Sequence, residues 1–142
     1  MHDVRTYDYA IVRVVPRVER GEFLNVGIIL SCDVERITAA CIDLDESALR
    51  ALDASVDLEL VRKSLDSILR IAAGGAAAGS LGRMSPRERF HWLTAPKSAL
   101  IQTSPVHTGQ CTDLAAAAAH LMDRMVRRPR GLTDQASTQT DC

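Results

Sequence analysis

Two apolar segments near the start of the chain, Tyr7–Val15 and Phe23–Cys32, constrain its fold more than any other feature. Both are rich in β-branched side chains, which is typical of β-strands. Only the short charged segment Pro16–Glu22 lies between them, so the two strands are expected to be neighbours joined by a turn. Pro16 ends the first strand, because proline cannot donate a hydrogen bond to a ladder.

Side chains alternate between the two faces of a strand, and this alternation predicts which face meets the helices. In the second strand one face carries only apolar residues: Leu24, Val26, Ile28, Leu30 and Cys32. The other face is mixed, and in the first strand the mixed face includes Arg13. This asymmetry indicates an antiparallel sheet that packs on helices through one side.

The remaining elements follow from turn and capping signals. A third strand is expected at Arg36–Leu44 and a fourth at Ser98–Thr103, followed by a turn at Ser104–Gly109. The stretch Gly74–Gly82 holds half of the chain's eight glycines and is expected to be a mobile loop. Helices are predicted at Asp45–Leu52, from Asp57 to Gly74, from the capping box at Ser85 to Ala95, and from Asp113 to Pro129.

These elements predict an α+β fold, with an antiparallel sheet of about four strands and helices packed mainly on one face. A length of 142 residues suits one domain. We expect residues 1–129 to form that single α+β domain. Residues 130–142 are rich in Ser, Thr, Gln and Asp, and we expect a disordered C-terminal tail there.

Composition excludes several functional classes. No apolar run approaches the ~20 residues that a membrane helix needs, and the N-terminus lacks the apolar region of a secretory signal. A cytoplasmic protein with free thiols is therefore expected, although it has four cysteines. No CxxC pair occurs, so we expect neither a metal site nor a cofactor. The net charge of −1 gives no general attraction to nucleic acid.

The first candidate site lies in and beside the predicted turn Pro16–Glu22. Arg13 lies in mid-strand between apolar neighbours, and a guanidinium there needs a partner if it is buried. Together with Arg17 it could hold a phosphate or a carboxylate. The alternative is a solvated turn in which Arg17, Glu22 and their neighbours neutralise one another.

The second candidate site joins a short helix to the turn that follows it. Arg89 and Trp92 share one face of that helix, while Ser104 and His107 lie in the turn. His107 could transfer protons near neutral pH, but a histidine near a tryptophan is more often a structural hydrogen-bonding residue. Ser104 has no carboxylate close in sequence that would complete a catalytic triad.

The only basic run is Arg124, Arg127, Arg128 and Arg130. These arginines could contact a nucleic-acid backbone. The preferred interpretation is that they complement the dipole at the end of the last helix and keep that end soluble.

Three segments resemble bacterial proteins grouped as domain of unknown function 3037: YDYAIVRVVPRVERGEFLNVGIIL, RFHWLTAPKSALIQTSPVHTG and AHLMDRMV. The resemblance covers about Asp3–Val126. It implies a small accessory protein whose gene often lies beside that of a HipA-like kinase, and hence a protein partner. The family pattern falls on Arg13, Arg17, Gly21, Glu22, Asn25, Gly27, Phe90, Trp92, Ser104, Pro105, His107 and Gly109.

The leading hypothesis is therefore a small cytoplasmic accessory module that binds a protein partner such as a HipA-like kinase. The predicted binding residues are Arg13, Arg17, Glu22, Asn25, Arg89, Trp92, Ser104 and His107. One alternative is a phosphate-handling enzyme, in which Arg13 and Arg17 hold the anion and His107 acts as acid or base. Another is a nucleic-acid-binding protein that uses the C-terminal basic helix. No membrane partner is expected.

Overall fold

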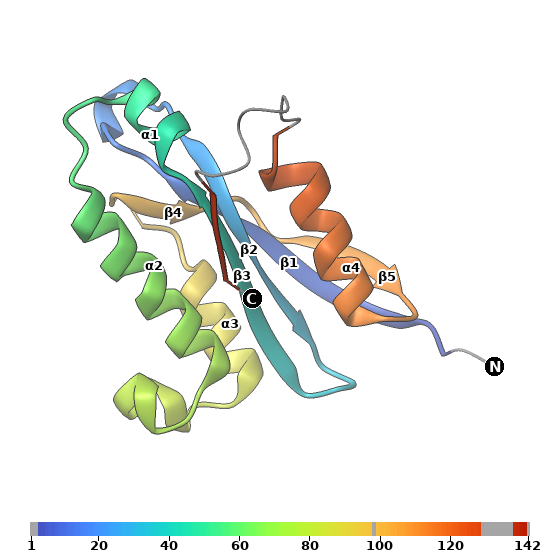
Figure 1. Ribbon diagram of the computed structural model, residues 1–142. Coiled ribbons are helices and arrows are strands. Elements are labelled where there is room, and N and C mark those ends of the chain that lie inside the picture. Colours follow the sequence, from blue (N-terminus) through green and yellow to red (C-terminus); the bar gives the residue numbers. More distant parts are fainter. Residues whose placement is uncertain (1–2, 98, 129–137, 142) are drawn as a thin grey trace.

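The computed structural model describes residues 3–97, 99–128 and 138–141, which form an α+β fold around an antiparallel sheet. The first three strands follow one another and pair in order: β1 (Arg5–Val14), β2 (Leu24–Cys32) and β3 (Ile37–Asp45). Two short strands share the free edge of β1, and a third lies on β3 (Figure 1). These are β4 (Ile101–Thr103) and β5 (His107–Cys111) on β1, and β6 (Thr138–Asp141) on β3.

The helices lie mainly on one face of this sheet, as predicted. That face is covered by α1 (Glu46–Leu52), α2 (Leu58–Ala73) and α3 (Pro86–Thr94). The helix α4 (Leu114–Leu121) and the π-helical turn that continues it, Met122–Val126, pack on the opposite face (Figure 1). We call the two sides the α2 face and the α4 face.

Capping residues start the helices where the sequence predicts. Asp45, Asp57 and Asp113 each accept hydrogen bonds from backbone amides in the first turn of α1, α2 and α4. Ser85 and Glu88 form the complete capping box of α3, with Pro86 in its first turn. Each cap satisfies amides that have no partner within the helix, which fixes the start of the helix.

A β-bulge in β2 divides its apolar residues between the two faces. Val12 pairs with Gly27 but Arg13 pairs with Asn25, so Val26 is an extra residue in β2. The bulge reverses the alternation beyond it. The α2 face therefore takes Leu24, Val26 and Ile29, and the α4 face takes Ile28, Leu30 and Cys32. The prediction that one apolar set of β2 meets the helices on a single face was wrong.

The predicted fourth strand and the turn after it differ from the structure. The strand is shorter than Ser98–Thr103, and Ser98 itself lies outside the described residues. The predicted turn Ser104–Gly109 contains the start of β5, so the chain leaves β1 only briefly around Pro105 and then pairs with it again. Proline explains this gap, because it has no amide hydrogen to donate to the ladder.

The glycine-rich stretch after α2 forms 3₁₀ turns at Ala76–Arg83 rather than an irregular loop. Its predicted mobility remains a prediction. Of the predicted C-terminal tail, most lies outside the described residues, as does Pro129; the described part forms β6. Among the residues that the structure describes, no helix is long and apolar enough to cross a membrane.

Candidate functional site

A row of three polar residues crosses the α4 face at the end of the sheet near the β1–β2 hairpin. Arg13 on β1 is paired with Asn25 on β2 and with Gln102 on β4. Residues directly opposite each other in an antiparallel pair point to the same side of the sheet. The β1–β2 hairpin and β4, which is distant in sequence, therefore place their polar side chains next to one another.

Arg13 is held against an aromatic ring rather than a carboxylate. Its guanidinium carbon lies 4.1 Å from the centroid of the Phe23 ring, and Phe23 is 46% exposed. Its Nε is buried without a hydrogen-bond partner among the described residues, and none of them forms an ion pair with it. Cation–π contact holds the side chain in place but leaves its donors free. An external acceptor, such as a carboxylate, could therefore bind there.

Asn25 connects this row to the helix on the α4 face. Its Nδ2 donates to the backbone oxygen of Met125 at 3.0 Å, while its Oδ1 is buried without a partner within the described chain. Asn25 and Asp43 line a hollow of about 10 Å³, and the Oδ1 of Asp43 also has no described partner. Such a volume is at the lower limit for a single water. The hollow is therefore too small for a substrate.

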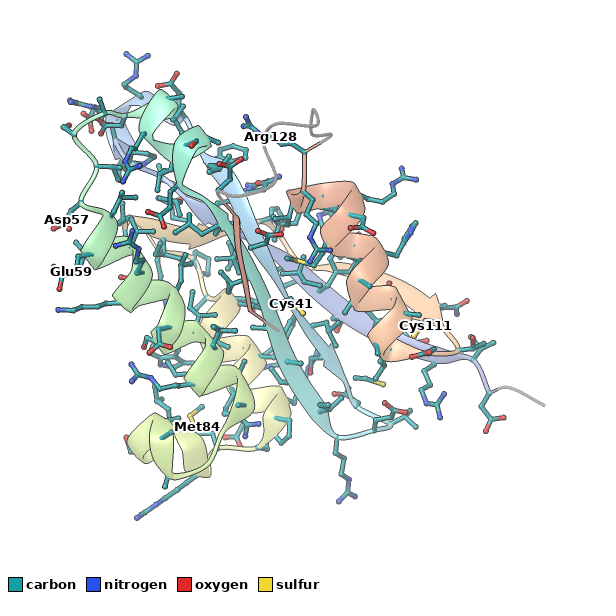
Figure 2. The ribbon with its side chains drawn as sticks, viewed as in Figure 1. Cys41, Asp57, Glu59, Met84, Cys111 and Arg128 are labelled. Atoms are coloured by element: carbon teal, nitrogen blue, oxygen red, sulfur yellow. The ribbon has the colours of Figure 1, made fainter. Side chains whose placement is uncertain are left out.

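Arg127 shows that the predicted basic run is partly used by the fold. Its Nε donates to Asp43 Oδ2 at 2.8 Å and its Nη1 donates to Asp123 at 2.9 Å. These two hydrogen bonds raise the pKa of Arg127 above its ordinary value, and the one that it donates to Asp43 has the larger effect. Arg124 is exposed on the last turn, Arg128 lies where the chain leaves it (Figure 2), and Arg130 is outside the described residues. This geometry does not form a continuous patch of unpaired arginines.

Arg17 and Glu22 lie in the β1–β2 hairpin and are both occupied by surface pairs. Arg17 Nε lies 3.5 Å from Asp53 Oδ2, and Glu22 accepts a hydrogen bond from Arg20. That hydrogen bond lowers the pKa of Glu22. In the described chain neither residue contacts Arg13. Their arrangement corresponds to the solvated turn in which opposite charges neutralise each other.

His107 is on the α4 face like Arg13, but at a distance from it. It pairs with Tyr9 at the start of β5, and the two rings are 5.5 Å apart. Arg13 is four residues further along β1, or about 13 Å at the rise of an extended strand. The buried side chain of Ile11 lies between them. His107 therefore lies apart from Arg13, whose guanidinium is stacked on Phe23.

Ser104 is a structural residue at the gap between β4 and β5. It is 3% exposed, and its Oγ accepts the amide hydrogen of Ile11 at 2.9 Å. The same hydroxyl donates to the backbone oxygen of Pro105, and the Ser104 amide donates to the Ile11 carbonyl. Its hydroxyl replaces the missing backbone acceptor for Ile11 and is not available as a nucleophile.

Arg89 and Trp92 are on the α2 side, away from Arg13. Arg89 is 8% exposed and donates to the carbonyl oxygens of Met84 at 2.5 Å and Ala72 at 3.4 Å. It therefore stabilises the end of α2, where carbonyl groups lack partners. Trp92 is 41% exposed, and Lys97 Nζ lies 4.1 Å from the centroid of its ring.

The structure thus brings Arg13 and Asn25 together and places the other predicted residues elsewhere. Sequence reasoning missed Gln102 and did not assign Phe23 to the site. Alternation alone places Phe23 and Asn25 on one face of their strand, but nothing in the sequence gives the register that puts Gln102 beside Arg13.

A family model, described as "Protein of unknown function (DUF3037)", matches residues 9–126 of the chain. The match includes Arg13, Phe23, Asn25 and Gln102. No curated protein matches the chain, and no solved structure matches it. A match over this much of the sequence means that the chain belongs to the DUF3037 family.

Proposed function

We propose that this protein is a small accessory module that binds a protein partner through the surface around Arg13, defined by Arg13, Phe23, Asn25 and Gln102. One observation carries the proposal. The Arg13 guanidinium lies on an exposed aromatic ring, has a buried Nε and has no carboxylate partner in the described chain. Arginine and aromatic side chains are enriched among the residues that dominate binding energy at protein interfaces.

The contrast with other arginines supports this proposal. Arg5, Arg87 and Arg127 lie at similar depth in the surface and each has a carboxylate within 2.8 Å. Arg13 is likewise partly buried, but it forms no ion pair with any carboxylate of the described chain. An acidic side chain of a partner would give the guanidinium the carboxylate that it lacks in the described chain, and it could bind the planar group through two parallel hydrogen bonds.

Binding is better supported than catalysis because no reactive group accompanies Arg13. His107 is about 13 Å away along the sheet, and the hydroxyl of Ser104 is engaged by the backbone. In the described chain no three His, Cys, Asp or Glu residues are grouped to hold a metal ion. We place the protein in the cytoplasm, where Cys32 and Cys111 would remain the thiols that they are in the structure.

The family resemblance makes a HipA-like kinase the first partner to test. The full chain would be co-expressed with the HipA-like kinase of the same genome, and the purified proteins would be titrated by calorimetry at about 10 μM, a concentration at which a Kd of 1 μM gives clear saturation. We expect a complex. Arg13→Ala should weaken it at least about tenfold.

Arg20→Ala is the matched control, because Arg20 is an exposed arginine in the same hairpin and its one ion pair within the described residues is with Glu22. It should bind like the wild type. If the two proteins show no binding, the HipA-like kinase is not the partner. If the Arg13→Ala and Arg20→Ala proteins bind the kinase with equal affinity, the surface around Arg13 is not the binding surface.

A further inference from the structure

An apolar groove of about 450 Å³ lies between α2, the end of α3 and β4. Ile68, Ile71 and Leu93 contribute to its lining, and Trp92 forms part of its wall. β4 lies alongside α2 at this edge of the sheet (Figure 1). The groove is on the α2 side, whereas the surface around Arg13 is on the α4 face; Gln102 of β4 borders both.

The strand beside the groove has an unpaired edge. Leu100 and Ser104 direct backbone groups to β1, and Gln102 is paired with Arg13 on that strand. Successive residues of a strand direct their backbone groups to opposite sides. The amide and carbonyl groups of Ile101 and Thr103 therefore point away from β1, where no strand of the described chain pairs with them. Such an edge is a template for another extended segment.

The charge of the groove is positive. Its described lining contains two charged residues, Lys63 and Lys97, and both are cations. Lys63 forms an exposed pair with Glu59, whereas Lys97 lies over the Trp92 ring and has no carboxylate partner in the described chain. Partial burial lowers the pKa of Lys97, as expected for a cation that has lost water without gaining a counter-charge.

We propose that the edge of β4 and this groove bind an extended acidic segment of a partner protein. The segment adds to the sheet by hydrogen bonding to Ile101 and Thr103. Every second side chain of the segment faces the groove; of these, the apolar ones enter it and the carboxylates near the two ends of the segment meet Lys97 and Lys63. This is strand addition, in which main-chain hydrogen bonds give affinity and alternate side chains give specificity. The inference goes beyond the proposed function, because it holds whether or not Arg13 binds a partner.

Trp92 is the only tryptophan in the chain, so its fluorescence reports directly on the groove. The probe is the capped peptide acetyl-ETVTVTE-amide, added to the full-length protein; its glutamates and valines share one face of the strand and its threonines take the other. We expect a saturable shift of Trp92 emission to shorter wavelength as the peptide covers the ring. Acetyl-KTVTVTK-amide has the same pattern with inverted charge, and it should bind at least about tenfold more weakly.

Two pairs of variants measure separately how the edge of β4 and the charge of Lys97 contribute to peptide binding. Thr103→Pro removes the amide hydrogen that points away from β1, whereas Thr103→Val keeps it. Proline is tolerated on edge strands, and circular dichroism shows whether each variant is folded. We expect about tenfold weaker peptide binding for Thr103→Pro and wild-type binding for Thr103→Val. Lys97→Glu should also lose about tenfold, while Arg83→Glu, a charge reversal outside the groove, should change binding little.

Three outcomes would overturn the inference. The first is equal binding of the acidic and basic peptides. The second is equal binding by Thr103→Pro and Thr103→Val. The third is an emission shift that rises with protein concentration in the absence of peptide, because it would assign the edge to a second copy of this chain.

Discussion

The guanidinium of Arg127 donates from Nε to the buried carboxylate of Asp43 at 2.8 Å, and this contact joins the end of the last helix to β3. Asp43 is 5% exposed, whereas Arg127 is partly open to solvent and also contacts Asp123. Burying a carboxylate without a partner is costly. The contact therefore keeps the π-helical turn Met122–Val126 in place against the α4 face.

Arg127→Ala should destabilise the protein by about 2–4 kcal/mol, because it leaves the Asp43 carboxylate buried without its cation. The free energy of unfolding, from urea denaturation, measures the change. Arg124→Ala removes an exposed arginine from the same turn and should stay within about 0.5 kcal/mol of the wild type. Equal stability of the two variants would show that the buried pair contributes nothing.

Gly74→Ala should cost about 1–2 kcal/mol more than Gly75→Ala. The two glycines have nearly the same backbone angles, with φ of 76° and 84°, so both substitutions impose the same backbone strain. A Cβ at Gly74 would lie 2.8 Å from Cζ of Arg89, whereas a Cβ at Gly75 meets nothing within 4 Å. Arg89 would have to move and lose its bonds to carbonyl groups. Thermal and urea unfolding of both variants measures the difference; identical losses would exclude this contact.

Asp8 should stabilise the fold at neutral pH and lose that effect in acid. Its pKa is lowered from the ordinary 3.8, chiefly because Thr108 donates a hydrogen bond to its carboxylate. Burial opposes this change, and a hydrogen bond from Arg87 adds to it. A lowered folded-state pKa means that the stabilisation is present above 3.8 and disappears as pH falls through the folded-state value. Asp8→Asn should therefore be less stable than the wild type at neutral pH, with the difference shrinking below 3.8.

Urea denaturation at a series of pH values measures this difference for Asp8→Asn. Asp66→Asn, at an exposed helix pair with Arg70, is the control and should differ little from the wild type at every pH. A constant gap between Asp8→Asn and the wild type down to the lowest pH would contradict the assigned hydrogen bonds.

Local signals predicted much of this fold because they depend on residues close in sequence. The caps at Asp45 and Asp57 and the capping box at Ser85 each involve contacts within one helical turn. The bulge at Val26 gave no such signal, because apolar residues continue at every second position through it, from Leu24 to Cys32. β5 was hidden by Pro105 and by polar residues that are typical of turns.

The candidate site was only partly predictable from the sequence, because it joins residues that are distant in sequence. Arg13 stands out because a charged residue in an apolar strand is unusual. Its neighbour Gln102 depends on the register between strands distant in sequence, which periodicity does not determine. Ser104 was predicted as a binding residue because it shares a turn with His107 and because the family pattern falls on it, whereas its acceptor function for Ile11 is visible only in three dimensions.

Ser104→Ala should cost about 1–3 kcal/mol, because it leaves the buried amide of Ile11 without an acceptor. Ser47→Ala is the control, since Ser47 is exposed in α1 and should tolerate alanine. Urea unfolding measures both changes. A Ser104→Ala protein as stable as Ser47→Ala would mean that the ladder does not need the hydroxyl.

Arg13 and Arg89 both bury an Nε without a partner in the described chain, yet substitution should affect them differently. Arg89 donates its other groups to the carbonyls of Met84 and Ala72, so Arg89→Met should cost about 2–3 kcal/mol. Arg13→Met removes a shielded charge and loses only the contact with Phe23, worth about 0.5–1 kcal/mol. The free energy of unfolding of Arg13→Met in urea should therefore be close to that of the wild type, because a residue that serves binding contributes little to stability. If Arg13→Met unfolds as easily as Arg89→Met, Arg13 is a structural residue and the proposed binding surface loses its basis.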